Sequence, residues 1–280
     1  MKSTAVFKQM KNRQEPITMI TAYDAPTGKA AEKAGMDMIL VGDSAGMVVH
    51  GYDSTIPVTL DDMVMHARAV RRGAPGTFIV VDMPFLTYHS SIESTFTAVR
   101  RLMQEGGAQA VKLEGGDEIT TETIARLTAA GVPVIGHIGL TPQSVGVLGG
   151  YRVQGKTKEA AQRLIKEARR LEQAGAFALV LECVPGELAA RIAMHLSIPV
   201  IGIGAGVGTD GQVLVFHDAV GWGDSFVPSF AKQYTNVQAQ IDEALESYVS
   251  DVKTKVFPED RHTFSMDASV LNDLSREGSS

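Results

Sequence analysis

Charged side chains recur in this sequence where short apolar runs end. The run Met38–Val41 leads through a glycine into Asp43, TFIVVDMP carries Asp82, AQAVKLEGG carries Lys112 and Glu114, and FALVLECVP carries Glu182. A short apolar run bounded by turn residues is typical of a strand that is buried on both faces. In parallel α/β proteins the carboxyl ends of such strands form the rim at which ligands bind. We therefore predict that these side chains gather at one rim.

Three of these side chains are carboxylates that follow three successive strands, namely Asp43, Asp82 and Glu114. Oxygen ligands without histidine or cysteine partners suit a hard, partly hydrated cation such as Mg²⁺. Each acid alone could instead cap a helix or pair with a lysine. That alternative is a poor account of all three, so the pattern favours a divalent cation site.

Lys112 lies two residues before Glu114, so both side chains point to the same side of their strand. If that side is the interior of the rim, Lys112 offers a positive charge to a substrate carboxylate or an enolate oxygen. A surface salt bridge is the alternative, but helices are expected to cover the outer side of this strand.

Glu182 and His137 are the remaining candidates for chemistry at the rim. Glu182 ends an apolar run, where a partly desolvated carboxylate can act as a general base; a helix-capping acid before Pro185 is about equally compatible with the residue alone. His137 either donates a hydrogen bond to the substrate or is a satisfied rim histidine. A cation, a lysine and a carboxylate base together indicate enolate chemistry next to a carbonyl group.

The elements that must position these residues alternate regularly between strand and helix. The expected strands are 17–24, 38–41, 78–81, 108–113, 132–138, 177–181, 199–203 and 213–216. The expected helices are 26–35, 60–72, 92–104, 119–130, 158–174, 187–196 and 237–256. This order predicts a (β/α)₈ TIM barrel, with an open doubly wound sheet as the alternative. We expect one domain over residues 1–280, with a short N-terminal cap (1–16) and a frayed polar tail (262–280).

Three long or glycine-rich segments are expected at the rim. The segment 47–59 is either a lid or an ordinary surface loop, and the segment 139–155 is a second long loop. The run 202–212 is a weak match to loops that hold phosphate groups, because glycines let backbone N–H groups approach an anion.

Composition excludes several classes of function. The 280 residues carry a net charge of −6, so there is no basic surface for nucleic acid. Cys183 is the only cysteine, which excludes an internal disulfide and a cysteine zinc cluster and fits a reducing cytoplasm. We expect Cys183 to be a small buried apolar residue. No apolar run approaches membrane-spanning length.

Several motifs together resemble the ketopantoate hydroxymethyltransferase family. They are VGDS, GYDSTIPVTLDDM, DMPF, KLEGG, GHIGLTPQS, GGYRVQG, LECVP, IPVIGIGAG and FHDAVG, and they run in family order from about residue 17 to 235. The resemblance implies a barrel of the phosphoenolpyruvate/pyruvate type, Mg²⁺ dependence, a role in pantothenate and coenzyme A synthesis, and a homodecamer. It also implies metal ligands at Asp43, Asp82 and Glu114, the last directly or through water.

The same resemblance implies a substrate, a co-substrate and a mechanism. The 2-oxo acid 3-methyl-2-oxobutanoate would chelate Mg²⁺ and contact Asp43, Ser44, Asp82 and Lys112, with Ser44 and Lys112 at its carboxylate. Glu182 would remove the C3 proton, and the enolate would attack the one-carbon unit of 5,10-methylenetetrahydrofolate. The folate is expected near the loops 139–155 and 202–212.

Two other functions remain open from the sequence. One is a C–C lyase of the same superfamily, which uses the same metal and oxo acid but usually a loop cysteine as acid. The other is a non-catalytic, metabolite-binding barrel, against which the presence of Asp43, Asp82, Lys112 and Glu182 argues.

Overall fold

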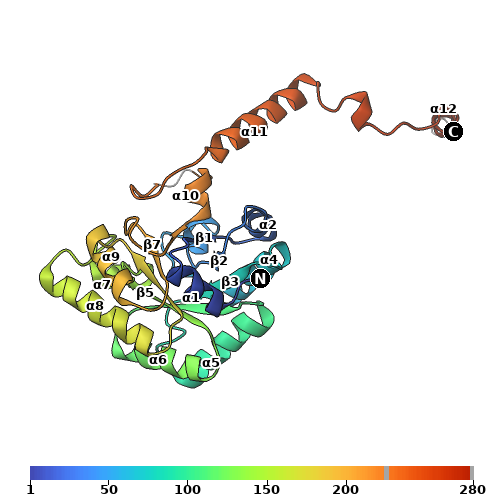
Figure 1. Cartoon of the computed structure of the whole chain (residues 1–280). Coiled ribbons are helices and arrows are strands. Elements are labelled where there is room, and N and C mark those ends of the chain that lie inside the picture. Colours follow the sequence, from blue (N-terminus) through green and yellow to red (C-terminus); the bar gives the residue numbers. More distant parts are fainter. Residues whose placement is uncertain (224–226, 278–280) are drawn as a thin grey trace. The chain divides into compact units, whose positions relative to one another are not determined.

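Eight parallel strands form a closed barrel in which each strand pairs with its neighbours in sequence and β8 pairs with β1 (Figure 1). The structure is a computed structural model that describes residues 1–223 and 227–277. The strands are β1 (Ile17–Thr21), β2 (Met38–Val41), β3 (Phe78–Asp82), β4 (Ala110–Glu114), β5 (Val134–Gly139), β6 (Ala178–Glu182), β7 (Val200–Ile203) and β8 (Gly211–Leu214). The predicted barrel is confirmed, and the open doubly wound sheet is wrong.

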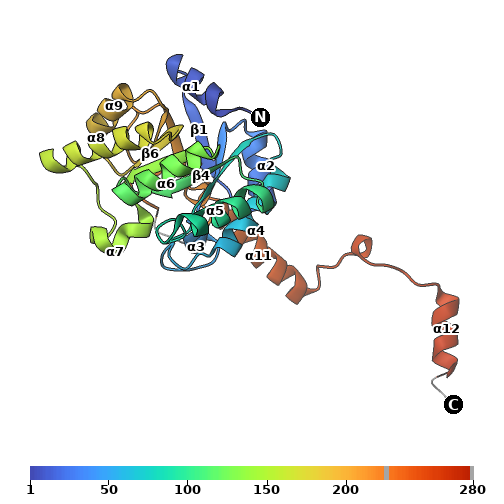
Figure 2. The ribbon, with the colours of Figure 1, turned by 90° about the horizontal axis from the view of Figure 1, so that it is seen from below.

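Helices surround the strands on the outside, as Figure 2 shows. They are α1 (Thr4–Asn12), α2 (Ala25–Lys33), α3 (Ala45–Val48), α4 (Leu60–Gly73), α5 (Ile92–Arg100), α6 (Glu118–Ala129), α7 (Val145–Leu148), α8 (Lys158–Gln173), α9 (Gly186–His195) and α10 (Phe216–Val220). A π-helical turn, η1 (Arg101–Glu105), continues α5, and a 3₁₀ turn, η2 (Pro142–Ser144), precedes α7.

Several predicted strand boundaries differ from the structure by one to three residues, and the differences in the first and last strands have identifiable reasons. The first strand ends at Thr21 rather than at residue 24, because the Asp24 side chain accepts a hydrogen bond from the Thr27 backbone N–H and caps α2. The last strand begins at Gly211, two residues before the predicted start. A Cβ atom at Gly211 would lie 2.3 Å from the Ile17 carbonyl oxygen, so only glycine allows β8 to pair this closely with β1.

Most of the strands read as apolar runs because both of their faces are buried, whereas β1 and β8 expose Thr18 and Gln212. On β3, Val80 belongs to the cluster inside the barrel, whereas Ile79 and Val81 belong to the cluster between the strands and the helices. A strand that is covered on both sides in this way has no solvent-exposed face that would require polar residues.

Helix α1 closes the N-terminal end of the barrel. Its Phe7 is fully buried and meets Phe78 edge-on at 5.2 Å and Phe177 in a stacked arrangement at 6.4 Å between ring centroids. Lys11 Nζ lies 2.6 Å from Asp210 Oδ2, which joins α1 to the start of β8. This end of the barrel therefore contributes packing, and the opposite rim is left for chemistry.

The chain separates into two compact units, Met1–Tyr234 and Thr235–Ser280. The second unit contains α11 (Val237–Thr254), the 3₁₀ turn η3 (Asp260–His262) and α12 (Ala268–Glu277), and α11 buries none of its residues. The segment expected to be a frayed tail thus contains a helix. We expected one domain over residues 1–280 with a tail at 262–280, whereas the second compact unit begins at Thr235. The domain assignment stays a prediction.

Among the described residues, no helix has both the length and the apolar character that crossing a membrane requires.

Candidate active site at the carboxyl ends of the strands

The side chains that the sequence singles out lie at the carboxyl ends of five adjacent strands. Asp43 follows β2, Asp82 ends β3, Lys112 and Glu114 lie on β4, His137 lies on β5, and Glu182 ends β6. Strand register pairs Asp82 with Lys112 and Glu114 with His137. All of them are buried except Glu182, whose side chain is 15% exposed. The structure therefore brings the predicted residues together at one rim.

Lys112 lies at the centre of this group. Its Nζ is 2.9 Å from Asp82 Oδ1, 3.5 Å from Glu114 Oε1 and 3.0 Å from His137 Nδ1. Lys112 and Glu114 point to the same inner side of β4, as their spacing predicts. Burial disfavours the ammonium, but the surrounding carboxylates outweigh it and raise the pKa of Lys112, so the group remains charged.

Three buried carboxylates share this single ammonium. Burial and the charges of Asp82 and Glu114 raise the pKa of Asp43 well above its usual range. Burial and Glu114 also raise the pKa of Asp82, despite the nearby Lys112. Although burial opposes its charge, Lys112 and His137 lower the pKa of Glu114 to about 2. The ionised forms of all three carboxylates would exceed the single positive charge of Lys112, and a divalent cation would correct that imbalance and favour ionised Asp43 and Asp82.

The donor set fits a hydrated Mg²⁺ ion held by few protein ligands. Among the residues that the structure describes, no three His, Cys, Asp or Glu side chains are arranged to hold one metal ion. Mg²⁺, however, usually takes one or two carboxylates and completes its shell with water and substrate oxygens. Asp43 and Asp82 are adjacent, since the Asp43 backbone N–H donates to Asp82 Oδ2 at 3.1 Å. Within the described part of the chain, the buried Asp82 Oδ1 has no hydrogen bond of good geometry, although it forms an ion pair with Lys112 Nζ at 2.9 Å.

His137 connects Lys112 to Glu182. Although burial and Lys112 oppose its charge, Glu114 and Glu182 raise the pKa of His137. Nε2 carries a proton both in the charged ring and in the neutral imidazole whose Nδ1 accepts from the Lys112 ammonium. Nε2 lies 3.3 Å from Glu182 Oε2 and has no hydrogen bond of good geometry. The imidazole N–H is thus directed at the carboxylate that was predicted to be the base.

Ser44 faces Tyr23 at the edge of the group. The Tyr23 hydroxyl lies 2.9 Å from Ser44 Oγ. Burial raises the pKa of Tyr23, so its hydroxyl keeps its proton and can donate it. Gly42 makes room for this contact, because a Cβ atom there would lie 2.8 Å from Ser44 Oγ.

Two residues with extensive contacts to the group were not predicted. Gln143, in η2, and Tyr88, between β3 and α5, are both buried and hydrogen-bonded to residues of the site. Gln143 lies within the loop 139–155 that was expected at the rim. No spacing rule could show which polar residue of that loop turns inward.

The rim loops contact each other above the strands. The Tyr151 hydroxyl lies 3.8 Å from Met47 Sδ, which joins the loop 139–155 to the segment 47–59. The segment 47–59 begins with the last turn of α3, and its function as a lid stays a prediction, as does the anion-binding function of 202–212.

Cys183 is free and buried, as predicted. Burial and the neighbouring Glu182 raise the pKa of its thiol to about 11. The thiol is therefore protonated near neutral pH and is a poor nucleophile.

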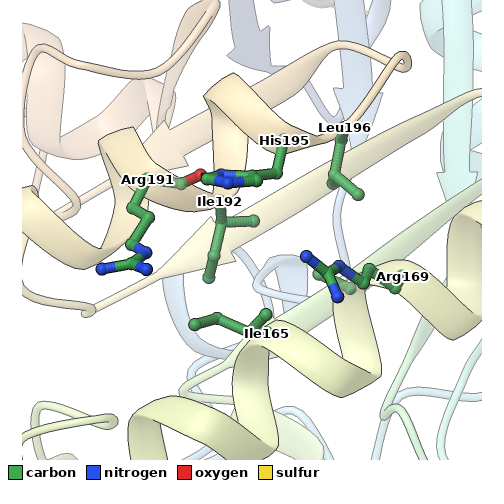
Figure 3. Close-up of a pocket in the computed structure, with 7 residues that line it drawn as sticks. Ile165, Arg169, Arg191, Ile192, His195 and Leu196 are labelled. Carbon is green, nitrogen blue, oxygen red and sulfur yellow. The ribbon is translucent and has the colours of Figure 1, made fainter.

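A separate pocket lies on the outside of the barrel between α8 and α9 (Figure 3). Its lining residues are Ile165, Ala168, Arg169, Arg191, Ile192, His195 and Leu196. None of the predicted site residues lines this pocket, so it has no part in the chemistry of the rim.

Known proteins resemble this chain over nearly its whole length. The family model described as ketopantoate hydroxymethyltransferase matches residues 2–260. The 3-methyl-2-oxobutanoate hydroxymethyltransferase of Shouchella clausii (strain KSM-K16) is 64% identical over 264 residues, which are 94% of each chain. The enzyme of the same name from Geobacillus thermodenitrificans (strain NG80-2) is 63% identical over 95% of each chain.

Solved structures share the fold at low sequence identity. Phosphoenolpyruvate phosphomutase from Streptomyces platensis subsp. rosaceus matches with a TM-score of 0.62 at 15% identity, over 99% of this chain and 96% of that one. 2,3-Dimethylmalate lyase, a member of the PEP mutase/isocitrate lyase superfamily, matches with a TM-score of 0.58 at 15% identity, over 99% and 100% of the two chains. The barrel is thus of the type that was expected.

Proposed function

The chain belongs to the ketopantoate hydroxymethyltransferase family, and from this premise we propose that it transfers a hydroxymethyl group from 5,10-methylenetetrahydrofolate to 3-methyl-2-oxobutanoate. The product is 2-dehydropantoate. The observation that carries the proposal is the buried group of Lys112 and three carboxylates, which His137 connects to Glu182. It offers both halves of enolate formation, namely an environment for an oxyanion and a carboxylate base.

Asp43 and Asp82 would hold Mg²⁺, with Glu114 in contact directly or through water. A phosphonopyruvate hydrolase of the same fold, with a TM-score of 0.60 at 15% identity, has been solved in a complex with oxalate and Mg²⁺. A cation at this position supplies Lewis acidity to the keto oxygen of the substrate, which acidifies the proton on C3.

Lys112 and Ser44 hold the carboxylate of the oxo acid in this proposal. The Lys112 ammonium is already charged and directed into the site, and Tyr23 orients the Ser44 hydroxyl. Fixing the carboxylate sets the position of C3 relative to the base.

Glu182 then accepts the C3 proton. It is the most exposed carboxylate of the group, as the acid that meets the substrate must be, and His137 Nε2–H orients its Oε2. The resulting enolate carbon attacks the methylene carbon of the folate, and the new C–C bond forms as the bond from that carbon to one folate nitrogen breaks. Water then displaces the second nitrogen and supplies the hydroxyl group, which releases tetrahydrofolate. The folate is placed near the rim loops 139–155 and 202–212.

The two other functions have less support. The lyases that share the fold do so at identities of 15–16%, which carry no function to this chain, and Cys183 is buried with its thiol protonated. A non-catalytic barrel would not need a base beside the buried group. The place in pantothenate and coenzyme A synthesis, the homodecamer and the cytoplasmic location belong to the same proposal.

Exchange of the C3 proton of 3-methyl-2-oxobutanoate in D₂O tests the proposal directly. With Mg²⁺ and without folate, we expect the C3 signal to disappear from the proton NMR spectrum. EDTA should abolish the exchange, and Mg²⁺, Mn²⁺ or Co²⁺ should restore it. A lyase or a non-catalytic binder should leave the signal unchanged, and full exchange in a chelated sample would refute the metal requirement.

A further inference from the structure

The side-chain amide of Gln143 joins the ends of several strands at the rim. Its Nε2 donates to Asp43 Oδ2 at 2.7 Å and to the Met83 carbonyl oxygen at 2.9 Å. Its backbone N–H donates to Glu114 Oε2 at 3.0 Å. Gln143 therefore contacts two of the three carboxylates although it carries no charge itself.

Tyr88 fixes the orientation of this amide. The Tyr88 hydroxyl donates to Gln143 Oε1 at 2.9 Å, and the Glu114 backbone N–H donates to the same hydroxyl at 3.2 Å. A flipped amide would direct its oxygen at Asp43 Oδ2 and at the Met83 carbonyl oxygen, which can only accept, and would leave the Tyr88 hydroxyl to donate to the Glu114 carbonyl oxygen at 3.2 Å. Only one orientation therefore satisfies every group, and both side chains are buried, so water cannot replace the lost bonds.

We infer that Gln143 is a positioning residue that, together with Tyr88, sets the orientation of the Asp43 carboxylate for the cation and the oxo acid. With Oδ2 held by the amide, Oδ1 is the oxygen of this carboxylate that is left for the cation or the oxo acid. This inference rests on the proposed function, because it takes Asp43 to be a ligand. It adds a residue that touches neither the reacting atoms nor the cation.

Binding of Mn²⁺ to the intact protein, followed by the EPR signal of the free ion, tests this inference. Gln143→Met keeps the length of the side chain and removes its hydrogen bonds. We expect the Kd for Mn²⁺ to rise about 10- to 100-fold, the usual effect of removing a partner that orients a metal ligand. Tyr88→Phe keeps the Nε2 donors but frees the amide to rotate, so its Kd should rise by less.

Gln109→Met is the matched control. Gln109 also makes side-chain hydrogen bonds to the backbone, accepting from Ile79 N–H at 2.9 Å and donating to the Gly107 carbonyl oxygen at 2.7 Å, but it is partly buried and lies just before the opposite end of β4. This variant should melt at a lower temperature and bind Mn²⁺ as the wild type does. A general loss of packing would instead weaken binding in both glutamine variants.

Unchanged Mn²⁺ affinity in Gln143→Met, or an equal loss in Gln109→Met, would overturn the inference. If Gln143→Met does not fold, Tyr88→Phe decides, and wild-type affinity in that variant overturns it. A wild-type protein that binds no Mn²⁺ overturns the inference and the proposed metal site together. A wild-type protein that binds Mn²⁺ but exchanges no C3 proton overturns only the proposed function, and the comparison of Gln143 and Gln109 still decides the inference.

Discussion

Glu182 differs from Asp82 and Glu114 in that it pairs with His137 and not with Lys112. Glu182→Gln keeps the shape of the side chain and removes only its ability to accept a proton. We expect C3 proton exchange and hydroxymethyl transfer to fall by roughly a hundredfold or more, the usual effect of losing a positioned base. NMR should therefore show the loss of C3 proton exchange, whereas EPR should show an affinity for Mn²⁺ near the wild-type value.

Glu187→Gln is the control for this prediction, because Glu187 is an exposed acid in the first turn of α9. This variant should leave both the rate of C3 proton exchange and the affinity for Mn²⁺ unchanged. If Glu182→Gln keeps exchange but loses transfer, another group is the base and Glu182 acts on the folate. If its affinity for the metal collapses, Glu182 is a ligand instead.

Lys112 carries the positive charge nearest to the carboxylates. Lys112→Ala should raise the KM for the oxo acid and lower turnover, because the substrate carboxylate loses its cation and Asp82 and Glu114 lose theirs. The KM for the folate should change little. Steady-state kinetics with each substrate varied in turn measure the two constants.

Lys11→Ala removes an ion pair of similar length, Lys11 Nζ to Asp210 Oδ2 at 2.6 Å, at the far end of the barrel. It should leave both KM values unchanged. An unaltered KM for the oxo acid in Lys112→Ala would contradict the assigned contact with the substrate.

The charged residues of the site were predictable because a strand end fixes their direction. Asp82, Lys112, Glu114 and Glu182 lie on strands, where the alternation of side chains determines which ones face inward. Gln143 and Tyr88 lie on the segments between strands and helices, where side chains do not alternate regularly between two faces. Their inward orientation follows from tertiary contacts that span 26 to 100 residues of the chain, among them the hydrogen bond between the two side chains.

Strand β5 ends at Gly139 in a conformation that side chains rarely adopt, with φ of 99°. A Cβ atom there would lie 2.2 Å from the Glu182 carbonyl oxygen. Gly139→Ala should therefore displace the end of β6 and its base. Since a misplacement of about 1 Å can cost about a hundredfold in rate, we expect turnover to fall at least tenfold, besides a loss of stability of about 1–3 kcal/mol from backbone strain.

Gly131→Ala separates strain from displacement, because Gly131 has a similar φ of 89° and nothing within 4 Å of its Cβ position. It should lose stability by a comparable amount, measured by urea unfolding, and keep its turnover. Equal turnover in the two variants would show that Gly139 does not position Glu182.

Helix and strand periodicity predicted most elements and their order but not every end. The segment expected as the helix 92–104 is helical over its whole length, but its geometry changes from α to π at Arg101. The predicted end of the first strand ignored the capping of α2 by Asp24. Both differences arise from local hydrogen bonds that hydrophobic periodicity does not describe.

The N-terminal end of the barrel contributes stability through packing, whereas the carboxyl-terminal rim carries the candidate active site. Phe7→Ala would leave a cavity between Phe78 and Phe177 and should cost about 3–5 kcal/mol. For a barrel of this size that lowers Tm by roughly 6–20 °C. Because the site lies at the opposite rim, kcat and both KM values at 25 °C should stay at the wild-type level.

Met65→Ala controls for the loss of an apolar side chain, since Met65 is 55% exposed. Its effect on the free energy of unfolding should stay within about 0.5 kcal/mol. Calorimetry and steady-state kinetics on the same samples measure the stability and the turnover of each variant. A fall in kcat for folded Phe7→Ala would contradict the prediction that this end of the barrel contributes only stability.

The hydrogen bond from Gln143 to Asp43 joins positions that are 100 residues apart in the chain. A ribosome that adds 5–20 residues per second needs about 5–20 s to make that stretch. Asp43 is therefore present in the nascent chain for several seconds before Gln143, whose amide orients it, has been synthesised. The binding site is completed late in translation, after the fifth strand and its loop have left the ribosome, and its earlier carboxylates spend that interval exposed to water rather than buried beside one another.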